Sequence, residues 1–160
     1  MTQESEQLLV PVHVASPAIA GRGLFASAPI KKRTVIAILC YMAPMMTVDD
    51  YQREQRNGNK LIEMTAIRWV GDHFLYGDEI TETEFINHSF EPNMLYHLGI
   101  CFALRDIVSG EELTVDYRHF LAENDVNQFD DLTTGKLVDG YGPTESLIVS
   151  TRALSELFSD

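Results

Sequence analysis

Cysteine is scarce in this chain of 160 residues, which contains only Cys40 and Cys101. Both cysteines lie inside apolar runs, so we expect them to be reduced and buried, as in a cytosol-like compartment, although one disulfide between them stays open. Two cysteines are too few for a multi-cysteine structural zinc cluster within the chain.

Long apolar runs are missing as well. None approaches the roughly 20 residues that a membrane-spanning helix needs, so we expect no membrane partner. The first residues, MTQESEQLL, carry acids and no basic region. We therefore expect no secretory signal and an intracellular protein, either cytoplasmic or nuclear.

Basic residues are few: 12 lysines and arginines face 24 aspartates and glutamates, for a formal net charge of −12. This charge argues against direct nucleic-acid binding, which needs basic surface to neutralise phosphates. It suits a basic protein or peptide as partner, although many proteins are acidic for solubility alone.

The remaining composition, 45% hydrophobic and 22% charged, is that of an ordinary globular protein. Short segments rich in β-branched or aliphatic residues predict strands, and Gly71-Asp72, Gly99 and Ser109-Gly110 predict turns between them. The predicted strands cover residues 8–14, 24–27, 33–39, 61–64, 67–70, 74–76, 94–98 and 100–107. A helix is expected to begin near Asp49 and to end at NGN, residues 57–59. Many short strands with few long helices indicate an all-β or β-rich fold.

The chain changes character after Tyr117. Residues 121–143 are polar and acidic and predict a loop or a partly ordered segment. A helix is then expected from Thr144 as its N-cap. Its predicted apolar face, expected to dock on the domain rather than on a partner chain, consists of Leu147, Ile148, Leu154, Leu157 and Phe158. We thus predict one core domain, residues 1–120, with an extension, residues 121–160, that packs on it or completes it; an oligomer is possible through this helix.

Two segments concentrate polar residues of potential chemical use: FINHSFEPNMLY, residues 85–96, and GEELTVDY, residues 110–117. Asn87-His88-Ser89 follow the end of an apolar segment, and Glu91-Pro92-Asn93 form a turn. Polar side chains at a strand end beside a tight turn are suited to binding a ligand. The same pattern also fits a well-bonded turn around a buried histidine.

These two segments resemble, in order and spacing, the signature motifs of the SET-domain protein lysine methyltransferases. AGRGLFAS, residues 20–27, is similar to the family's Gly-x-Gly cofactor segment, and Cys40-Tyr41-Met42-Ala43 stand where the family has Tyr-x-Gly. The resemblance implies a small stand-alone SET domain without zinc-binding modules. It implies a mainly β, SET-domain-like (β-clip) fold of several small sheets with a C-terminal pseudoknot, a short insert helix and a C-terminal helix.

The resemblance also implies an activity, which is transfer of a methyl group from S-adenosylmethionine to a lysine side chain, with S-adenosylhomocysteine as product. The implied cofactor-binding residues are Gly21, Arg22, Gly23, Asn87, His88 and Tyr117. Tyr117 corresponds to the catalytic tyrosine beside the transferring methyl group, and Tyr41, Tyr96 and Tyr117 would line the lysine channel. The lysine must be neutral to react, which a narrow apolar channel favours, so no general base is required.

Several positions depart from the family pattern. Phe90 replaces a cysteine, Ala43 replaces the glycine of Tyr-x-Gly, and Glu84 stands where an arginine is common. Without a zinc module, an aromatic cover for the cofactor must come from the tail, where Phe120, Phe129 and Tyr141 are candidates. Ala43, Glu84 and the missing zinc module motivate an alternative, a catalytically weak or inactive SET-like module that binds a peptide or the cofactor.

A metal-dependent enzyme built on histidines and an acid is a further alternative. Its ligands would be His88, Glu91, His97 and His119, since imidazole and carboxylate are suitable metal ligands. Nothing in the sequence indicates that these residues converge, so we expect no metal site.

Overall fold

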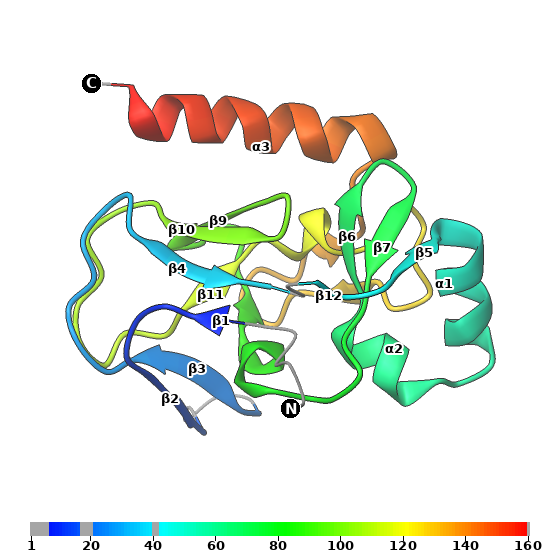
Figure 1. Cartoon of the computed structure of the whole chain (residues 1–160), viewed down its shortest axis with the longest axis horizontal. Helices are drawn as coiled ribbons and strands as arrows, with labels where there is room; N and C mark the ends of the chain where they lie inside the picture. The colour runs from blue at the N-terminus through cyan, green and yellow to red at the C-terminus, as the bar shows by residue number, and fades with distance from the viewer. Residues whose placement is uncertain (1–6, 17–20, 40–41, 160) are drawn as a thin grey trace.

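A computed structural model describes residues 7–16, 21–39 and 42–159. Cys40 and Tyr41 lie outside the described residues. Figure 1 shows several small sheets with two short helices at one end and a long helix along one side. The largest sheet has four antiparallel strands in the order β1 (Gln7–Leu8), β4 (Val35–Ile38), β10 (Ile100–Ala103) and β9 (Met94–His97).

The predicted strand over residues 8–14 is two strands in different sheets. β1 ends at Leu8, and β2 (Val12–Ala15) instead pairs with β3 (Gly23–Ala26). Pro11 lies between them and has no N–H to donate to a ladder, which favours a break at this point. The Pro11 carbonyl still accepts from the Ser27 N–H, at 2.9 Å, and ties this break to the end of β3.

The third sheet joins β5 (Met45–Thr47), β7 (His73–Leu75) and β6 (Ile67–Val70), and Gly71 turns the chain between β6 and β7 with φ +57°, as predicted. The predicted helix is α1 (Val48–Arg56), which starts at Thr47, whose hydroxyl accepts from the Asp50 N–H at 3.2 Å.

The predicted strand at 61–64 is wrong, because α2 (Lys60–Thr65) occupies this segment. Asn59 is the N-cap of α2 and accepts from the Ile62 N–H at 3.4 Å. The NGN segment therefore ends one helix and begins the next. Ile62 and Thr65, three residues apart, are buried, which is helical rather than strand spacing.

The centre of the fold is a short parallel pair, β8 (Asn87–His88) with β11 (Thr114–Val115). On its other side the segment before β11 bonds to β3, since the Leu113 N–H donates to the Leu24 carbonyl at 2.8 Å. The second motif thus runs between an N-terminal strand and the first motif. Leu113 and Val115 are fully buried here, as is Cys101, as predicted. The C-terminal pseudoknot that the family resemblance implies would lie in this region.

Short 3₁₀ helices flank this centre. η1 (Glu82–Phe85) precedes β8, and η2 (Tyr117–His119) follows β11. Glu84, which replaces the family's arginine, accepts from the Thr81 N–H at 2.5 Å and closes a capping box on η1.

The C-terminal segment forms a small hairpin, β12 (Phe129–Asp130) with β13 (Leu137–Val138), and then α3 (Pro143–Phe158). The predicted N-cap is wrong: Gly142 caps α3, and Pro143 takes the first helical position, where its missing N–H costs nothing. No helix in the described ranges is long and apolar enough to span a membrane.

Helix α3 docks along β9, as expected, but not through the whole predicted apolar face (Figure 1). Leu157 is buried, whereas Ile148 and Phe158 are about half exposed. Two serines occupy the buried side: the Ser146 hydroxyl bonds His119 Nδ1, and the Ser150 hydroxyl bonds His97 Nδ1, each at 2.9 Å. These polar contacts set the rotation of the helix.

Candidate active site

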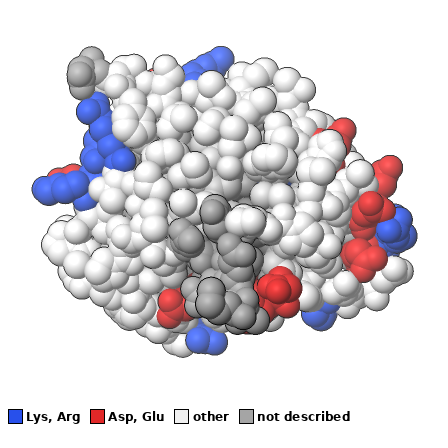
Figure 2. Space-filling view, viewed as in Figure 1, with Lys and Arg blue, Asp and Glu red and all other residues white. Residues whose placement is uncertain are grey.

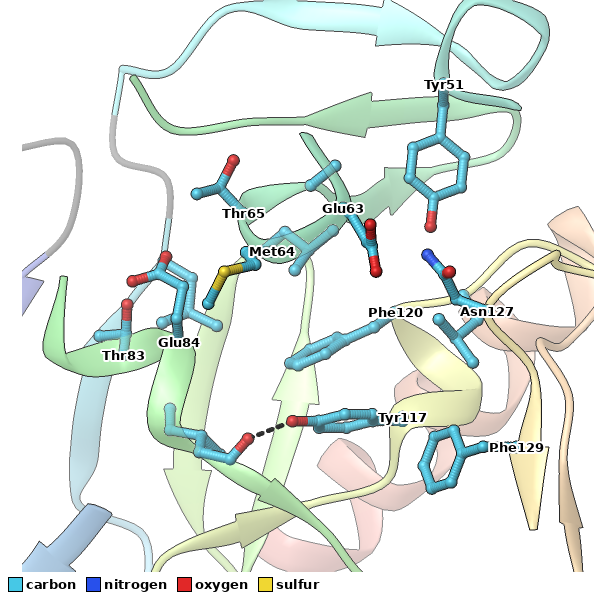
Figure 3. A pocket seen from close by; sticks show the side chains of 15 residues that line it. Tyr51, Glu63, Met64, Thr65, Thr83, Glu84, Tyr117, Phe120, Asn127 and Phe129 are labelled. Atoms are coloured by element: carbon cyan, nitrogen blue, oxygen red, sulfur yellow. Dashed lines mark hydrogen bonds between the residues drawn. The ribbon is translucent and has the colours of Figure 1, made fainter. Parts of the chain in front are cut away.

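A cavity of about 360 Å³ lies between η2, α2, η1 and the loop that precedes β12 (Figure 3). Most of its lining is apolar, and its polar residues are five with short polar or acidic side chains and two tyrosines. The lining residues are Leu39, Tyr51, Glu63, Met64, Thr65, Ala66, Ile67, Thr83, Glu84, Ile86, Tyr117, Phe120, Leu121, Asn127 and Phe129.

Tyr117 belongs to the wall of this cavity. Its hydroxyl donates a hydrogen bond to the Ile86 carbonyl, as the dashed line in Figure 3 marks, and its ring stacks on Phe120 with centroids 5.3 Å apart. Burial, with a further contribution from the charge of Glu112, raises the pKa of Tyr117 to about 12. The hydroxyl is therefore neutral near pH 7, with its hydrogen directed at Ile86.

The loop at residues 21–23 needs glycine twice, for different reasons. Gly21 has φ +60°, a conformation that side chains disfavour. Gly23 is buried, and a Cβ placed there would lie 2.4 Å from Glu112 Oε1. At the second glycine any side chain would displace the Glu112 carboxylate from its present position.

Asn87 joins this loop to the second motif. Its amide Nδ2 donates to the Arg22 carbonyl at 3.0 Å and to Glu112 Oε1 at 2.7 Å. Because both partners are acceptors, the amide nitrogen must face them, and Oδ1 points elsewhere. Oδ1 accepts no hydrogen bond from any residue that the structure describes. The Arg22 side chain is not in this network and lies over the Phe85 ring, 4.1 Å from its centroid.

His88 is held by the backbone of the second motif, at Tyr117. Its Nδ1 accepts from the Tyr117 N–H at 3.0 Å, so a neutral ring carries its proton on Nε2. Burial lowers the pKa of His88. Nε2 is buried without a hydrogen-bond partner. The rings of Phe90 and Phe129 pack nearly perpendicular to the His88 ring, with centroids 4.6 and 5.8 Å from its centroid. His88 therefore braces Tyr117 and does not offer a base to the cavity.

Tyr96, the second predicted channel residue, lies one layer behind the cavity wall. It is 4% exposed, packs edge-on against Phe120 at 4.8 Å, and donates its hydroxyl hydrogen to the Arg68 carbonyl. A direct channel role for Tyr96 stays a prediction, as does that of Tyr41, which lies outside the described residues.

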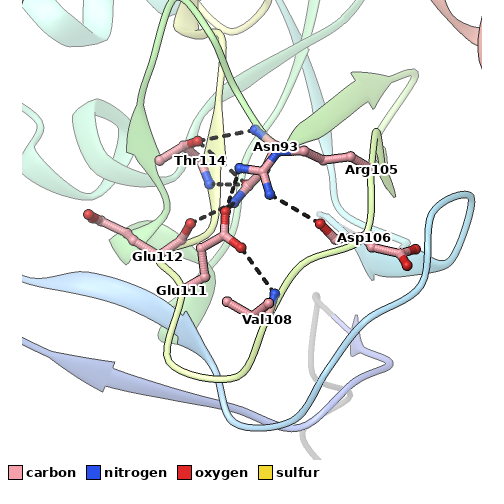
Figure 4. Close-up of polar contacts among 7 residues, drawn as sticks. All are labelled: Asn93, Arg105, Asp106, Val108, Glu111, Glu112 and Thr114. Atoms are coloured by element: carbon pink, nitrogen blue, oxygen red, sulfur yellow. Dashed lines mark hydrogen bonds and ion pairs between the residues drawn. The ribbon is translucent and has the colours of Figure 1, made fainter.

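Asn93 is a site-building residue whose role could not be read from the sequence beyond its place in a turn. It is 3% exposed and ties the two motifs together (Figure 4). Its Nδ2 donates to the Glu112 carbonyl at 2.8 Å, and its Oδ1 accepts from the Thr114 N–H at 2.9 Å. Glu111 points to the opposite side from Glu112, where it pairs with Arg105.

The three aromatic residues of the tail that could cover the cofactor lie in different places. Phe129 and Phe120 line the cavity, and Phe129 also contacts His88 and Tyr117. Tyr141 instead packs against Arg118 and His119, outside the cavity.

The residues of the metal hypothesis do not come together. His97 and His119 each bond a serine of α3, and His88 bonds the backbone of Tyr117. Within the described ranges, no three histidine, cysteine or acidic side chains are grouped so that they could hold a metal ion.

The sequence model of the SET domain matches residues 21–118, which is more than half of the chain. The chain belongs to the SET-domain family of methyltransferases. A solved chain from work on the structural basis for the product specificity of histone lysine methyltransferases resembles this SET domain with a TM-score of 0.55 and 22% sequence identity. The alignment covers 69% of this chain and 51% of the solved chain, so the SET domain spans about half the length of that relative. No curated protein matches significantly. The predicted mainly β SET fold is confirmed.

Proposed function

We propose that this SET domain transfers a methyl group from S-adenosylmethionine to the side-chain amine of a lysine in a basic protein. The observation that carries the proposal is the position of the Tyr117 hydroxyl, in the wall of a largely apolar 360 Å³ cavity and bonded to the Ile86 carbonyl. Two oxygen atoms thus lie together at one point of a cavity with the size and lining of a small ligand site.

Of the implied cofactor residues only Tyr117 lines this cavity; Asn87 directly follows Ile86, and the His88 ring contacts the Tyr117 ring. The chemistry of these neighbouring residues suits the cofactor. Asn87 Oδ1 is an acceptor without a partner among the described residues, which fits the ammonium group of the cofactor's amino-acid end. The loop of residues 21–23 and the backbone of His88 would hold the rest, and Phe129, 36% exposed beside His88, is the aromatic side chain best placed to cover it. When bound, the cofactor supplies an electrophilic methyl group on a sulfonium.

Tyr117 and Ile86 act by position. The hydroxyl hydrogen is committed to the Ile86 carbonyl, so the lone pairs of both oxygens are the groups available to a reacting methyl, through weak C–H···O contacts. Holding the two reactants in line supplies most of the acceleration. Apolar walls such as Ile67 and Phe120 exclude water and favour the neutral, reactive form of a lysine.

No histidine near Tyr117 is available as a base. His88 accepts from the Tyr117 N–H, and His119 is buried against Ser146, where burial lowers its pKa to about 4. Desolvation of the lysine, rather than proton abstraction by a dedicated residue, is the route this cavity supports.

The experiment is incubation with labelled S-adenosylmethionine and a panel of basic proteins, with cofactor binding measured separately by calorimetry. We expect label on lysine with the wild type, its loss in Tyr117→Phe, and cofactor binding in both. Tyr76→Phe, which removes a tyrosine hydroxyl outside the cavity lining, is the matched control and should retain transfer.

The outcomes separate the alternatives. Cofactor or peptide binding without any transfer would support the inactive SET-like module instead. Neither transfer nor binding would overturn the proposal, and equal transfer by Tyr117→Phe would overturn the role of the hydroxyl.

A further inference from the structure

Glu112 is a carboxylate without a counter-ion at the centre of the proposed cofactor cradle. It is half-buried, and none of the described lysines, arginines or histidines forms an ion pair with it. Its neighbour Glu111 pairs with Arg105 on the opposite side. A partly buried negative charge is stabilised by a positive charge placed beside it, so a cationic ligand would be favoured next to Glu112.

The same carboxylate fixes the orientation of Asn87. Oε1 accepts from Asn87 Nδ2 at 2.7 Å and lies where a side chain on Gly23 would have to be. Since the other hydrogen of Nδ2 goes to the Arg22 carbonyl, the amide cannot turn over without facing two acceptors with its own oxygen. Glu112 thereby keeps Asn87 Oδ1 directed outward.

The charge of Glu112 also reaches the reaction point. It contributes to the raised pKa of Tyr117, after burial, so its field acts at the tyrosine hydroxyl. The negative charge of Glu112 disfavours a phenolate at Tyr117. The same charge would attract and stabilise a cation bound between Asn87 and Tyr117.

We infer that Glu112 is a positioning and electrostatic residue of the cofactor site, which orients the Asn87 amide and favours a sulfonium over the neutral thioether that remains after transfer. The inference rests on the proposed function. Its consequence is release of product: once the methyl group leaves, the ligand loses the positive charge that Glu112 attracts, while Asn87 and the glycine loop remain unchanged.

The test measures binding of S-adenosylmethionine and S-adenosylhomocysteine by calorimetry, without turnover. Glu112→Gln keeps an oxygen for Asn87 but removes the charge. We expect the ratio of the two affinities, cation over thioether, to fall about five- to tenfold, the size expected for one charge at a few ångströms in a protein environment. Glu112→Ala removes the anchor as well and should weaken both ligands by about tenfold or more.

Glu111→Gln is the matched control, because it removes one negative charge from the adjacent residue on the opposite side and should leave the ratio unchanged. An unchanged ratio in Glu112→Gln would overturn the electrostatic role, and wild-type affinities in Glu112→Ala would overturn the positioning role. If a thermal melt shows that the alanine variant is unfolded, the isosteric glutamine variant still tests the electrostatic role of Glu112. A wild type that binds neither ligand would instead overturn the proposed function.

Discussion

The hydroxyl of Tyr117 has its hydrogen and its oxygen in different surroundings. The hydrogen is bonded to the Ile86 carbonyl, and the oxygen belongs to the cavity wall. Burial and the charge of Glu112 raise the pKa of Tyr117 to about 12, so the neutral form persists throughout the range in which enzymes are assayed. The protonation state of Tyr117 therefore does not change over this range of pH.

A pH profile tests this assignment. A lysine must lose a proton to react, and its ordinary pKa is about 10.4, so kcat/KM should rise with pH through the neutral range. Because Tyr117 stays protonated until about pH 12, no descending limb should appear between about pH 7 and about pH 10. A bell-shaped profile with a descending limb in that interval, in protein shown to remain folded, would contradict this account of Tyr117.

Gly23 gives a second prediction at the scale of the residue. In Gly23→Ala the new methyl group would meet Glu112 Oε1 at 2.4 Å, so Glu112 must move and Asn87 loses its anchor. We expect a loss of cofactor affinity of about tenfold or more and a destabilisation of about 1–3 kcal/mol. Calorimetry and denaturant unfolding measure the two effects.

Gly142→Ala is the control for that substitution, because Gly142 has a negative φ and a Cβ there makes only ordinary contact, 3.8 Å from Glu123 Oε2. Cofactor affinity should not change in this variant. The sequence could indicate that residues 21–23 need glycine, through the family resemblance. It could not indicate that a carboxylate from 89 residues further along occupies the space, because nothing local connects Gly23 with Glu112.

The C-terminal helix is the element that supports the turn of Tyr117 from behind. α3 presents Ser146 to His119 and Ser150 to His97, and Arg33 donates to the Leu157 carbonyl at 2.8 Å near its other end. His119 belongs to η2, the same turn as Tyr117. The docking of α3 and the placement of Tyr117 are therefore parts of one packed unit.

Acid should weaken this unit. Burial lowers the pKa of His119 to about 4 from 6.5, so the folded chain keeps the ring neutral while the unfolded chain protonates it. Stability is thus fully present above pH 6.5 and falls as pH decreases toward 4, by about 3 kcal/mol for this group. Denaturant unfolding across this range measures the loss, which should be smaller in His119→Gln. His13→Gln, at an exposed position, should keep the wild-type dependence, and an identical slope in His119→Gln would contradict the assignment.

Strands, helices and turns that depend on their own residues could be predicted from the sequence. Features that depend on contacts with other segments could not. Gly71-Asp72 and the bounds of α1 depend on local chemistry and follow the prediction. The segment 61–64 is apolar and short, so its type could not be separated by composition, and the cap at Asn59 decides for a helix. The face of α3 could not be predicted because histidines of β9 and η2 select two serines instead of apolar residues.

Charge is distributed over the whole molecule with a strong excess of acid, at a formal −12. On the face drawn in Figure 2, the largest group of lysine and arginine side chains lies at the left edge, with others at the top, bottom and right, while most of the acidic side chains lie toward the right. Glu63 and Glu84 add two carboxylates to the cavity lining. The overall field therefore favours approach of a basic partner.

Salt should act on the protein substrate more than on the cofactor. Raising the ionic strength from about 0.05 M to about 0.3 M shortens the screening length to below ~10 Å, so kcat/KM for a lysine-rich peptide should fall severalfold. Affinity for S-adenosylmethionine, which depends on contacts at short range, should change much less. A salt-independent kcat/KM would show that the acidic surface does not steer the substrate.

At the scale of the molecule, the meeting of residues 21–23, 87–88 and 112–117 is what forms the proposed cofactor site. It depends on β11 pairing with β8 on one side and on the Leu113–Leu24 bond on the other. The hydrophobic periodicity of the sequence does not reveal such long-range pairings. Only the family resemblance, which rests on the order of the motifs, implied them. The cavity size, the role of Asn93 and the place of Phe129 required the structure.

The most direct measurement of the central claim is mass spectrometry of a basic protein after reaction with S-adenosylmethionine, comparing wild type, Tyr117→Phe and Tyr76→Phe. The account predicts methyl groups on lysine side chains with the wild type and with Tyr76→Phe, and a loss of about tenfold or more with Tyr117→Phe. Methylation confined to residues other than lysine, or equal lysine methylation by Tyr117→Phe, would contradict it.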